Sequence, residues 1–511
     1  MTAALTGQAP PSPAPTPPPA SGPHRAAASH PWRPLLVRMH FYAGVLIGPF
    51  VLVLCLSGVA YAFTPQLDRL LYAQELSADP AGRAPLPLAT QVEAAVKARP
   101  DLRMTGLRAV HGPDETTRVD FAEPGLPAMS SRSVYVDPYT AQVRGELVTR
   151  HGGTPLSAWL GALHGDLHLG EPGRIYAELA TIWLVIVLVG GLALWWERSR
   201  RHRRPGPTGT REAWRRLLVV DRRHPGLHTT MSWHSVVGLW AAGLALVIAL
   251  TGLMVSGSAG ARWTSLLASL NASNPRLSTQ LAPAAGAAAA AVPTDGGHSG
   301  HSMPAPPASA GTPARPGTVT GAGLAPAGLP VDAILAAAQS GGVTEAVNLT
   351  APKAPGQAWL ASEADLTWPV NLDQAAIDPH TGQVVRTLSW SEWPVLAQAN
   401  RLLLFFHFGR TFGLLNQLAL IVISLALTAS VLWGYQMWWQ RRPHHGPARW
   451  GRAPRRGAWR SAPRGRLLLG IAVVGAIGVV LPVFGVSLLV FLAVDAVWGR
   501  RRRPAPAETA G

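Results

Sequence analysis

The chain has 511 residues, of which 48% are hydrophobic and only 14% are charged, and its formal net charge is +17. Its arginines gather beside apolar runs of about 20 residues or more, which argues for a lipid bilayer as partner and against nucleic acid. The single cysteine, Cys55, excludes a disulfide framework and cysteine-based zinc or iron–sulfur sites. Metal chemistry therefore has to rest on histidine, methionine or carboxylate side chains.

The N-terminal part is predicted to be a disordered tail followed by a membrane span. Residues 1–31 are rich in Pro and Ala with almost no large apolar side chain. The apolar run 35–63 contains "AYAF", which mimics a signal cleavage site, but it is about twice the ~7 to 15 residues of a signal peptide's apolar region. We therefore expect a retained span, followed by a first external module (64–152) and an interfacial helix (155–170).

Three further runs, 174–197, 233–256 and 412–439, each have the ~20 residues that one crossing of a bilayer requires. The loops 198–232 and 440–466 are rich in arginine, whereas the longer loops between the spans are much less basic. The positive-inside rule then places these two basic loops and the N-terminus in the cytoplasm.

The last apolar run, 467–498, is too long for one simple span. It is interrupted by "LPVFG" (Leu481 to Gly485) and has basic residues on both flanks, which predicts a hairpin of two short helices before a tail (499–511). Residues 282–328 are a Pro/Ala/Gly-rich insert, expected to be an external linker. The insert carries His298, His301 and Met303, whose side chains suit copper, although a chance pairing is the simpler interpretation.

The sequence contains a long repeat. At an offset of 243 residues, His164 matches His407 and Gly170 matches Gly413; at an offset of 194, His40 matches His234 and "SG" at 57–58 matches "TG" at 251–252. The external loops match through "YVDPYTAQV" and "AIDPHTGQV", which have the chemistry of strand–turn–strand hairpins.

The predicted fold class is thus a mainly α-helical, polytopic membrane protein. It comprises an internally duplicated four-span core, a C-terminal helical hairpin and two small α+β external modules, the second over 329–390 and followed by an interfacial helix (391–409).

Four histidines occupy matched positions at the ends of spans. His40 and His234 begin outward-running spans, and His164 and His407 precede inward-running spans, so each pair is expected at one membrane face. The simpler alternative is that each histidine only caps or anchors its helix, but ionisable residues at such positions are functional candidates. Two imidazole pairs suit axial ligation of two hemes.

Glycines near these histidines are expected to let a flat macrocycle approach the backbone. They lie four residues after His40 and His234 and six after His164 and His407. His168 lies four residues after His164, on the same face if the helix continues. Its counterpart in the repeat is Thr411, so an alternative heme ligand, a hydrogen-bond donor and an external metal contact stay open for it.

Five features of the sequence carry a family resemblance: "WRPLLVRMHFYAG", "LHGDLHLGEPGR", "WHSVVG", "FFHFGRTFG" and the two hairpins. Together they resemble the PepSY-associated transmembrane proteins, a group that includes iron-regulated inner-membrane proteins and ferric-siderophore reductases. The two hairpins are similar to PepSY modules. The resemblance implies a bacterial inner-membrane protein with a cytoplasmic N-terminus and periplasmic PepSY-like modules. It also implies two b-type hemes held by His40, His234, His164 and His407, and reduction of a ferric siderophore or related metal chelate in the periplasm.

The electron donor is not named by any motif. The sequence has no GxGxxG fingerprint, which leaves quinol, a flavin or a separate reductase. Two other functions fit the resemblance: a non-enzymatic PepSY regulator of a peptidase, and a permease for iron or a siderophore. The permease is less favoured because the spans show no evident buried carboxylates of the kind expected along such a path.

Overall fold

The computed structural model describes residues 33–110, 112–202, 214–215, 217–281, 328–344, 346–442 and 464–501. The N-terminal tail, nearly all of the insert with His298, His301 and Met303, the middle of the first basic loop, most of the second and most of the C-terminal tail lie outside these described residues.

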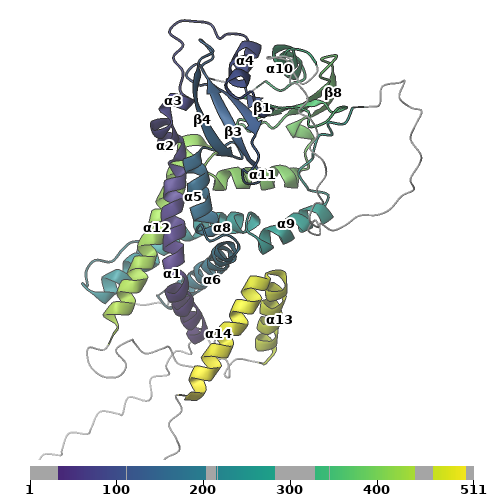
Figure 1. Cartoon of the computed structure of the whole chain (residues 1–511). Helices are drawn as coiled ribbons and strands as arrows, with labels where there is room; N and C mark the ends of the chain where they lie inside the picture. Colours follow the sequence, from purple (N-terminus) through teal and green to yellow (C-terminus); the bar gives the residue numbers. More distant parts are fainter. Residues whose placement is uncertain are drawn as a thin grey trace, which may run out of the picture.

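Four long helices form the membrane part of the protein, which confirms the expectation of a mainly helical chain with four spans. They are α1 (Arg33–Ala62), α6 (Glu171–His202), α8 (Leu227–Met254) and α12 (Gly413–Gln440) (Figure 1). Each contains a long window that is apolar around its whole circumference, as lipid-exposed helices are.

The four helices pack as a ring in the order α1, α6, α8, α12, so that α1 lies diagonally opposite α8. Small side chains in the bundle core, such as Ala43, Ala241 and Ala245, let the backbones approach closely. Side chains from diagonally opposite helices therefore meet along the central axis of the ring.

Short helices cover the end of the bundle that meets the sheet, which we call the sheet end; the opposite end is the far end. These helices are α2 (Thr64–Leu71), α3 (Ala73–Leu76), α5 (Pro155–Asp166), α9 (Ser258–Ser269) and α11 (Val395–His407). Thr154 caps α5 by accepting a hydrogen bond from the backbone N–H of Ser157 (3.2 Å). Asp68 of α2 accepts from the hydroxyls of Thr154 and Ser157, which ties α5 to the continuation of α1.

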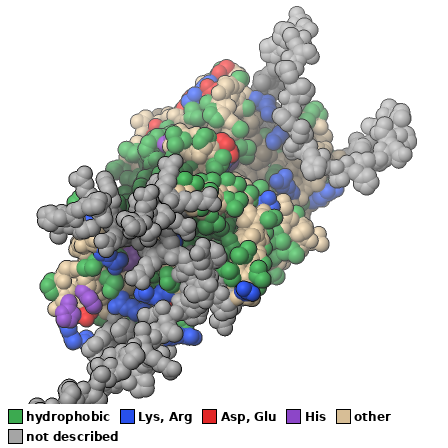
Figure 2. All heavy atoms as spheres, turned by 90° about the horizontal axis from the view of Figure 1, so that it is seen from below, with side chains coloured by type: hydrophobic (Ala, Val, Ile, Leu, Met, Phe, Trp, Pro, Cys, Tyr) green, Lys and Arg blue, Asp and Glu red, His purple; other side chains and the backbone are tan. Residues whose placement is uncertain are grey.

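The far end carries basic side chains. Figure 2 views the molecule from this end and shows basic side chains (blue) around a largely apolar surface.

An eight-stranded antiparallel sheet stands on the sheet end, in the order β4-β3-β2-β1-β5-β6-β7-β8. The first four strands are β1 (Arg103–Arg108), β2 (Thr117–Ala122), β3 (Ser130–Val136) and β4 (Val143–Arg150). The last four are β5 (Val347–Thr350), β6 (Trp359–Glu363), β7 (Gln374–Ile377) and β8 (Val384–Leu388). Pairing of β1 with β5, with Leu107 opposite Leu349, joins the two halves into one continuous sheet.

Helices α4 (Leu88–Ala98) and α10 (Val331–Ser340) cover one face of this sheet, and α11 and the bundle lie on its other side (Figure 1). Apolar side chains from both halves, including Phe121, Trp359 and Ile377, form a single core under α4 and α10. Asp332 of α10 accepts hydrogen bonds from the backbone N–H groups of Leu88 (2.7 Å) and Ala89 (2.9 Å) and so caps α4 of the other half. The two predicted external modules are thus packed as one body.

The Asp-Pro turns form as the sequence predicts. Asp137 and Asp378 each accept two backbone N–H groups inside their turns, which lead from β3 to β4 and from β7 to β8. The turn ends in a left-handed residue, which is Gly382 (φ +70°) in the second turn and Ala141 (φ +57°) in the first. A glycine adopts this conformation without steric cost, whereas an alanine is strained in it.

The C-terminal apolar run forms two helices, α13 (Arg464–Val480) and α14 (Pro482–Arg501), that pack against each other with the break at Leu481. Proline cannot continue the helix hydrogen bonding, so the break falls directly before Pro482. Trp183 of α6 contacts the ring of Phe484 (centroids 5.7 Å apart) and donates a hydrogen bond to Ser487 (3.1 Å). The hairpin therefore docks on the outside of the bundle.

Candidate functional site: two histidine pairs

At the far end, His40 of α1 and His234 of α8 meet across the bundle. Their ring centroids lie 6.0 Å apart with an interplanar angle of 83°. The Nδ1 atom of His40 lies 3.0 Å from the carbonyl oxygen of Val187, and that of His234 lies 2.9 Å from the carbonyl oxygen of Ser430. These carbonyls belong to α6 and α12, so all four spans build this pair.

At the sheet end, His164 of α5 and His407 of α11 form a second pair, with ring centroids 6.4 Å apart and an interplanar angle of 55°. Nδ1 of His164 lies 3.0 Å from the hydroxyl of Ser57 in α1. Nδ1 of His407 lies 3.0 Å from the hydroxyl of Thr251 and 3.1 Å from the carbonyl oxygen of Ile248, both in α8. The short helices thus place their histidines against the ends of the spans.

These contacts select one tautomer. A carbonyl oxygen only accepts hydrogen bonds, so Nδ1 of His40, His234 and His407 carries the proton. The Ser57 hydroxyl donates to the carbonyl oxygen of Leu54 (3.1 Å), which leaves it to accept from Nδ1 of His164. In a neutral ring Nε2 then keeps its lone pair, which is the form in which histidine binds a metal.

The spacing of each pair fits two axial ligands of one metal. A metal–imidazole bond of about 2.0 Å on each side, added to the distance from nitrogen to ring centre, puts two axial ring centroids about 6.3 Å apart. The measured separations of 6.0 and 6.4 Å match this value. Among the described residues no group of three or more His, Cys, Asp or Glu side chains is placed to hold a metal ion, so neither pair has a third such side chain beside it.

Four glycines lie directly against the imidazole rings. A Cβ atom would come 3.2 Å from Cε1 of His40 at Gly191 and 3.9 Å from Cε1 of His234 at Gly434. At Gly58 and at Gly252 it would come 3.3 Å from Cε1 of His164 and of His407, respectively. Sequence reasoning noted 58 and 252 only as part of the repeat and missed 191 and 434, although these two also match at the offset of 243.

The glycines expected to approach a macrocycle have other environments. A Cβ atom at Gly44 or at Gly238 would meet no other atom within 4 Å, so these two glycines border open space. Gly170 and Gly413 adopt positive φ (+66° and +53°) where α6 and α12 begin, which identifies them as turn residues. Gly44 and Gly238 thus leave space beside the backbone, whereas Gly170 and Gly413 allow the backbone to turn into the next helix.

His168 lies apart from the sheet-end pair. Helix α5 ends at Asp166, and Leu167 and His168 adopt left-handed φ values of +57° and +56°, so the expected continuation of the helix to His168 is wrong. The exposed ring of His168 instead faces Trp159, with centroids 4.8 Å apart. The structure brings together His164 and His407 without His168.

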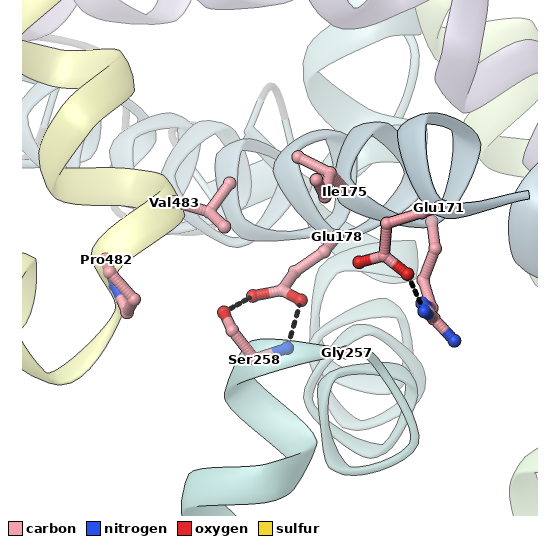
Figure 3. Close-up of a pocket in the computed structure, with 8 residues that line it drawn as sticks. Glu171, Ile175, Glu178, Gly257, Ser258, Pro482 and Val483 are labelled. Atoms are coloured by element: carbon pink, nitrogen blue, oxygen red, sulfur yellow. Dashed lines mark hydrogen bonds and ion pairs between the residues drawn. The ribbon is translucent and has the colours of Figure 1, made fainter. Parts of the chain in front are cut away.

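The spans do contain a buried carboxylate, contrary to the sequence-based expectation. Glu178 of α6 is only 2% exposed and borders a cavity of about 560 Å³ between α6, the start of α9 and the start of α14 (Figure 3). Its oxygens accept hydrogen bonds from the backbone N–H groups of Ser258 (2.8 Å) and Ala259 (3.2 Å) and from the Ser258 hydroxyl. This carboxylate therefore caps α9, which gives it a structural role.

Basic side chains lie between the sheet and the sheet end. Leu107 points into the core under α4 and α10, so its neighbour Arg108 points to the opposite, bundle-facing side of β1. Within the described part of the chain Arg108 has no ion-pair partner. Burial, together with the nearby charges of Arg118 and Arg410, lowers the pKa of Arg108, and Glu115 and Asp365 partly offset this. Such a guanidinium is available to an anion.

Comparison with known proteins gives one family. None of the curated proteins compared matches the chain. The model of the PepSY-associated TM region matches residues 37–441, which include all four spans, both histidine pairs and the whole sheet; the C-terminal hairpin lies outside the match. Because this match covers most of the chain, the protein is a member of the PepSY-associated transmembrane family.

Proposed function

We propose that the protein carries electrons through the bacterial inner membrane on two b-type hemes and reduces a ferric siderophore or similar metal chelate on the periplasmic side, where the sheet stands. The observation that carries the proposal is the geometry of the two histidine pairs. Each pair has axial spacing, protonated Nδ1 atoms and Nε2 lone pairs that are left for a metal.

In this proposal His40 and His234 hold the far-end heme and His164 and His407 hold the sheet-end heme. When bound, heme iron supplies reversible one-electron chemistry. The protein residues orient each imidazole through the Nδ1 hydrogen bonds, and the apolar spans exclude water from both sites. Along α1, the levels of His40 and Ser57 are separated by about 25 Å at 1.5 Å per residue, which covers most of the hydrocarbon layer.

The ferric chelate is proposed to dock between the sheet and the sheet end. Arg108, Arg118 and Arg410 line this region, and Arg410 lies three residues after His407. An unpaired guanidinium suits a chelate with carboxylate or catecholate groups, because arginine binds oxyanions through bidentate hydrogen bonds. The electron donor, which we take to be a quinol or a flavin reductase, would act at or near the far end.

An absorption spectrum of the purified protein tests the proposal. The dithionite-reduced minus oxidised spectrum should show a b-type α band, which His40→Ala and His407→Ala should each diminish. His168→Ala is the matched control, because His168 lies close in sequence but outside the pair, and it should leave the band unchanged.

Two results would contradict the proposal. One is a folded protein that contains no heme when the precursor is supplied during expression. The other is a band that responds to His168→Ala but not to His407→Ala.

A further inference from the structure

The two histidine pairs differ in what their Nδ1–H groups contact. At the far end both groups donate to backbone carbonyl oxygens, at 3.0 Å for His40 and 2.9 Å for His234. At the sheet end both groups meet a side-chain hydroxyl at 3.0 Å, that of Ser57 for His164 and that of Thr251 for His407. The two ends of the bundle therefore differ in the hydrogen-bond acceptor, while the two matched histidines within each pair share it.

The hydroxyl protons at the sheet end are already committed to backbone carbonyls. Ser57 donates to Leu54 (3.1 Å), and Thr251 donates to Val247 and Ile248 (2.9 Å each). The Ile248 carbonyl also lies 3.1 Å from Nδ1 of His407, so it is shared between a hydroxyl and an imidazole. The sheet-end imidazoles thus donate to a neutral hydroxyl or to a carbonyl that already accepts from that hydroxyl.

The acceptor changes the donor strength of the imidazole toward a metal. A backbone carbonyl accepts a hydrogen bond more strongly than an alcohol does, and strong acceptance at Nδ1 makes Nε2 more basic. A more basic axial ligand stabilises ferric over ferrous iron and lowers the reduction potential, because second-shell hydrogen bonding is one of the levers that set heme potential. The weaker acceptors at the sheet end act in the opposite direction.

We infer that Ser57 and Thr251 are positioning residues that keep the reduction potential of the sheet-end heme above that of the far-end heme. This inference rests on the proposed function. With hemes held by the two histidine pairs, one electron would pass from ferrous iron at the far end to ferric iron at the sheet end, with no proton transferred. The transfer is then downhill toward the side where the chelate docks.

A spectroelectrochemical titration of the full-length, heme-loaded protein tests the inference. The wild type should show two reduction waves. Ser57→Ala and Thr251→Val leave Nδ1–H with a backbone carbonyl acceptor alone, that of Leu54 for His164 and that of Ile248 for His407. Each substitution should move the higher wave down while the lower wave stays in place. The expected change is about threefold or more in the reduction equilibrium constant, or roughly 28 mV from 59 mV per tenfold for one electron.

Three variants separate this role from a structural one. Ser57→Thr and Thr251→Ser keep a hydroxyl and should retain the wild-type potentials. Thr181→Val removes an α6 hydroxyl that donates to the carbonyl oxygen of Ala177 (2.8 Å) close to Gly252 but contacts no histidine nitrogen, so it should move neither wave.

An unchanged or raised higher wave, or an equal shift of both waves, overturns the inference when heme content is intact, and it leaves the proposed function standing. A wild-type chain that holds no heme contradicts the proposed function, and the inference falls with it.

Discussion

Gly191 and Gly434 are matched in the repeat, yet the structure predicts different outcomes when each is replaced by alanine. A Cβ at Gly191 would lie 3.2 Å from Cε1 and 3.6 Å from Nδ1 of His40, whereas a Cβ at Gly434 would lie 3.9 Å from Cε1 of His234. Because carbon atoms are best separated by about 3.5 to 4.0 Å, the His40 ring would have to retreat by roughly 0.3 to 0.8 Å. The His234 ring would not have to move.

The global stability of Gly191→Ala should change little. Overpacking costs about 1 to 3 kcal/mol, and the gain in helix propensity from Gly to Ala returns about 1 kcal/mol. On the proposed heme assignment, heme affinity at the far end should respond more strongly. Disturbing the groups that orient a metal-bound histidine typically weakens metal binding by about 10- to 100-fold, so we expect a loss of that order for Gly191→Ala.

Transfer of heme to an excess of a heme scavenger measures this effect, with the unfolding midpoint recorded for each variant. Gly191→Ala should release far-end heme about tenfold faster or more, and Gly434→Ala should stay within about twofold of the wild type. Gly44→Ala is a further control for substitution in the bundle, because its Cβ would meet no protein atom within 4 Å. Equal release from Gly191→Ala and Gly434→Ala would refute the placement of His40 against α6.

Four further substitutions concern the sheet and the helices that cover it. Ala141→Gly should stabilise the protein by about 0.5 to 1 kcal/mol, because it removes a left-handed alanine. Gly382→Ala should destabilise the protein by more than this amount, since its Cβ would also lie 2.9 Å from Leu329. Denaturant unfolding measures both changes in the free energy of unfolding. Changes of the same sign for the two variants would contradict the turn geometry. Asp332→Ala should lower the stability of the protein by about 1 kcal/mol, because it removes the cap of α4. The loss should be measurable as faster hydrogen exchange in Leu88–Ala98. Asp79→Ala, on an exposed loop, is the control. The Arg132 guanidinium lowers the pKa of Glu123, so this pair stabilises the fold above the unfolded pKa of about 4.3 and loses its effect as pH falls through the lower, folded value. Glu123→Gln should therefore flatten the decline of thermal stability below about pH 4, and an unchanged pH profile would show that the pair contributes nothing.

Much of the membrane part can be predicted from sequence because long apolar runs, arginine-rich loops and Pro482 act locally. The long repeat in the sequence allows further predictions about the membrane part. Because His40 matches His234 and His164 matches His407, the repeat predicts two histidine pairs, and the structure brings the members of each pair together. The Asp-Pro turns are likewise encoded within a few residues.

Features that depend on packing between distant segments could not be predicted in this way. The joining of β1 to β5 depends on backbone hydrogen bonds between segments about 240 residues apart, which leave no local pattern. The contacts of Gly191 and Gly434 become visible only when the spans are packed. His168 illustrates a different limit, because a prediction from periodicity assumes that the helix continues and the left-handed turn at Leu167 ends it.

The heme content per chain tests the central claim most directly. Pyridine hemochrome quantification of the purified, heme-loaded protein should give two b-type hemes per chain, with one lost in His40→Ala and the other lost in His407→Ala. A content of one heme that survives either substitution, or no heme in a folded chain, would contradict the assignment of the two histidine pairs.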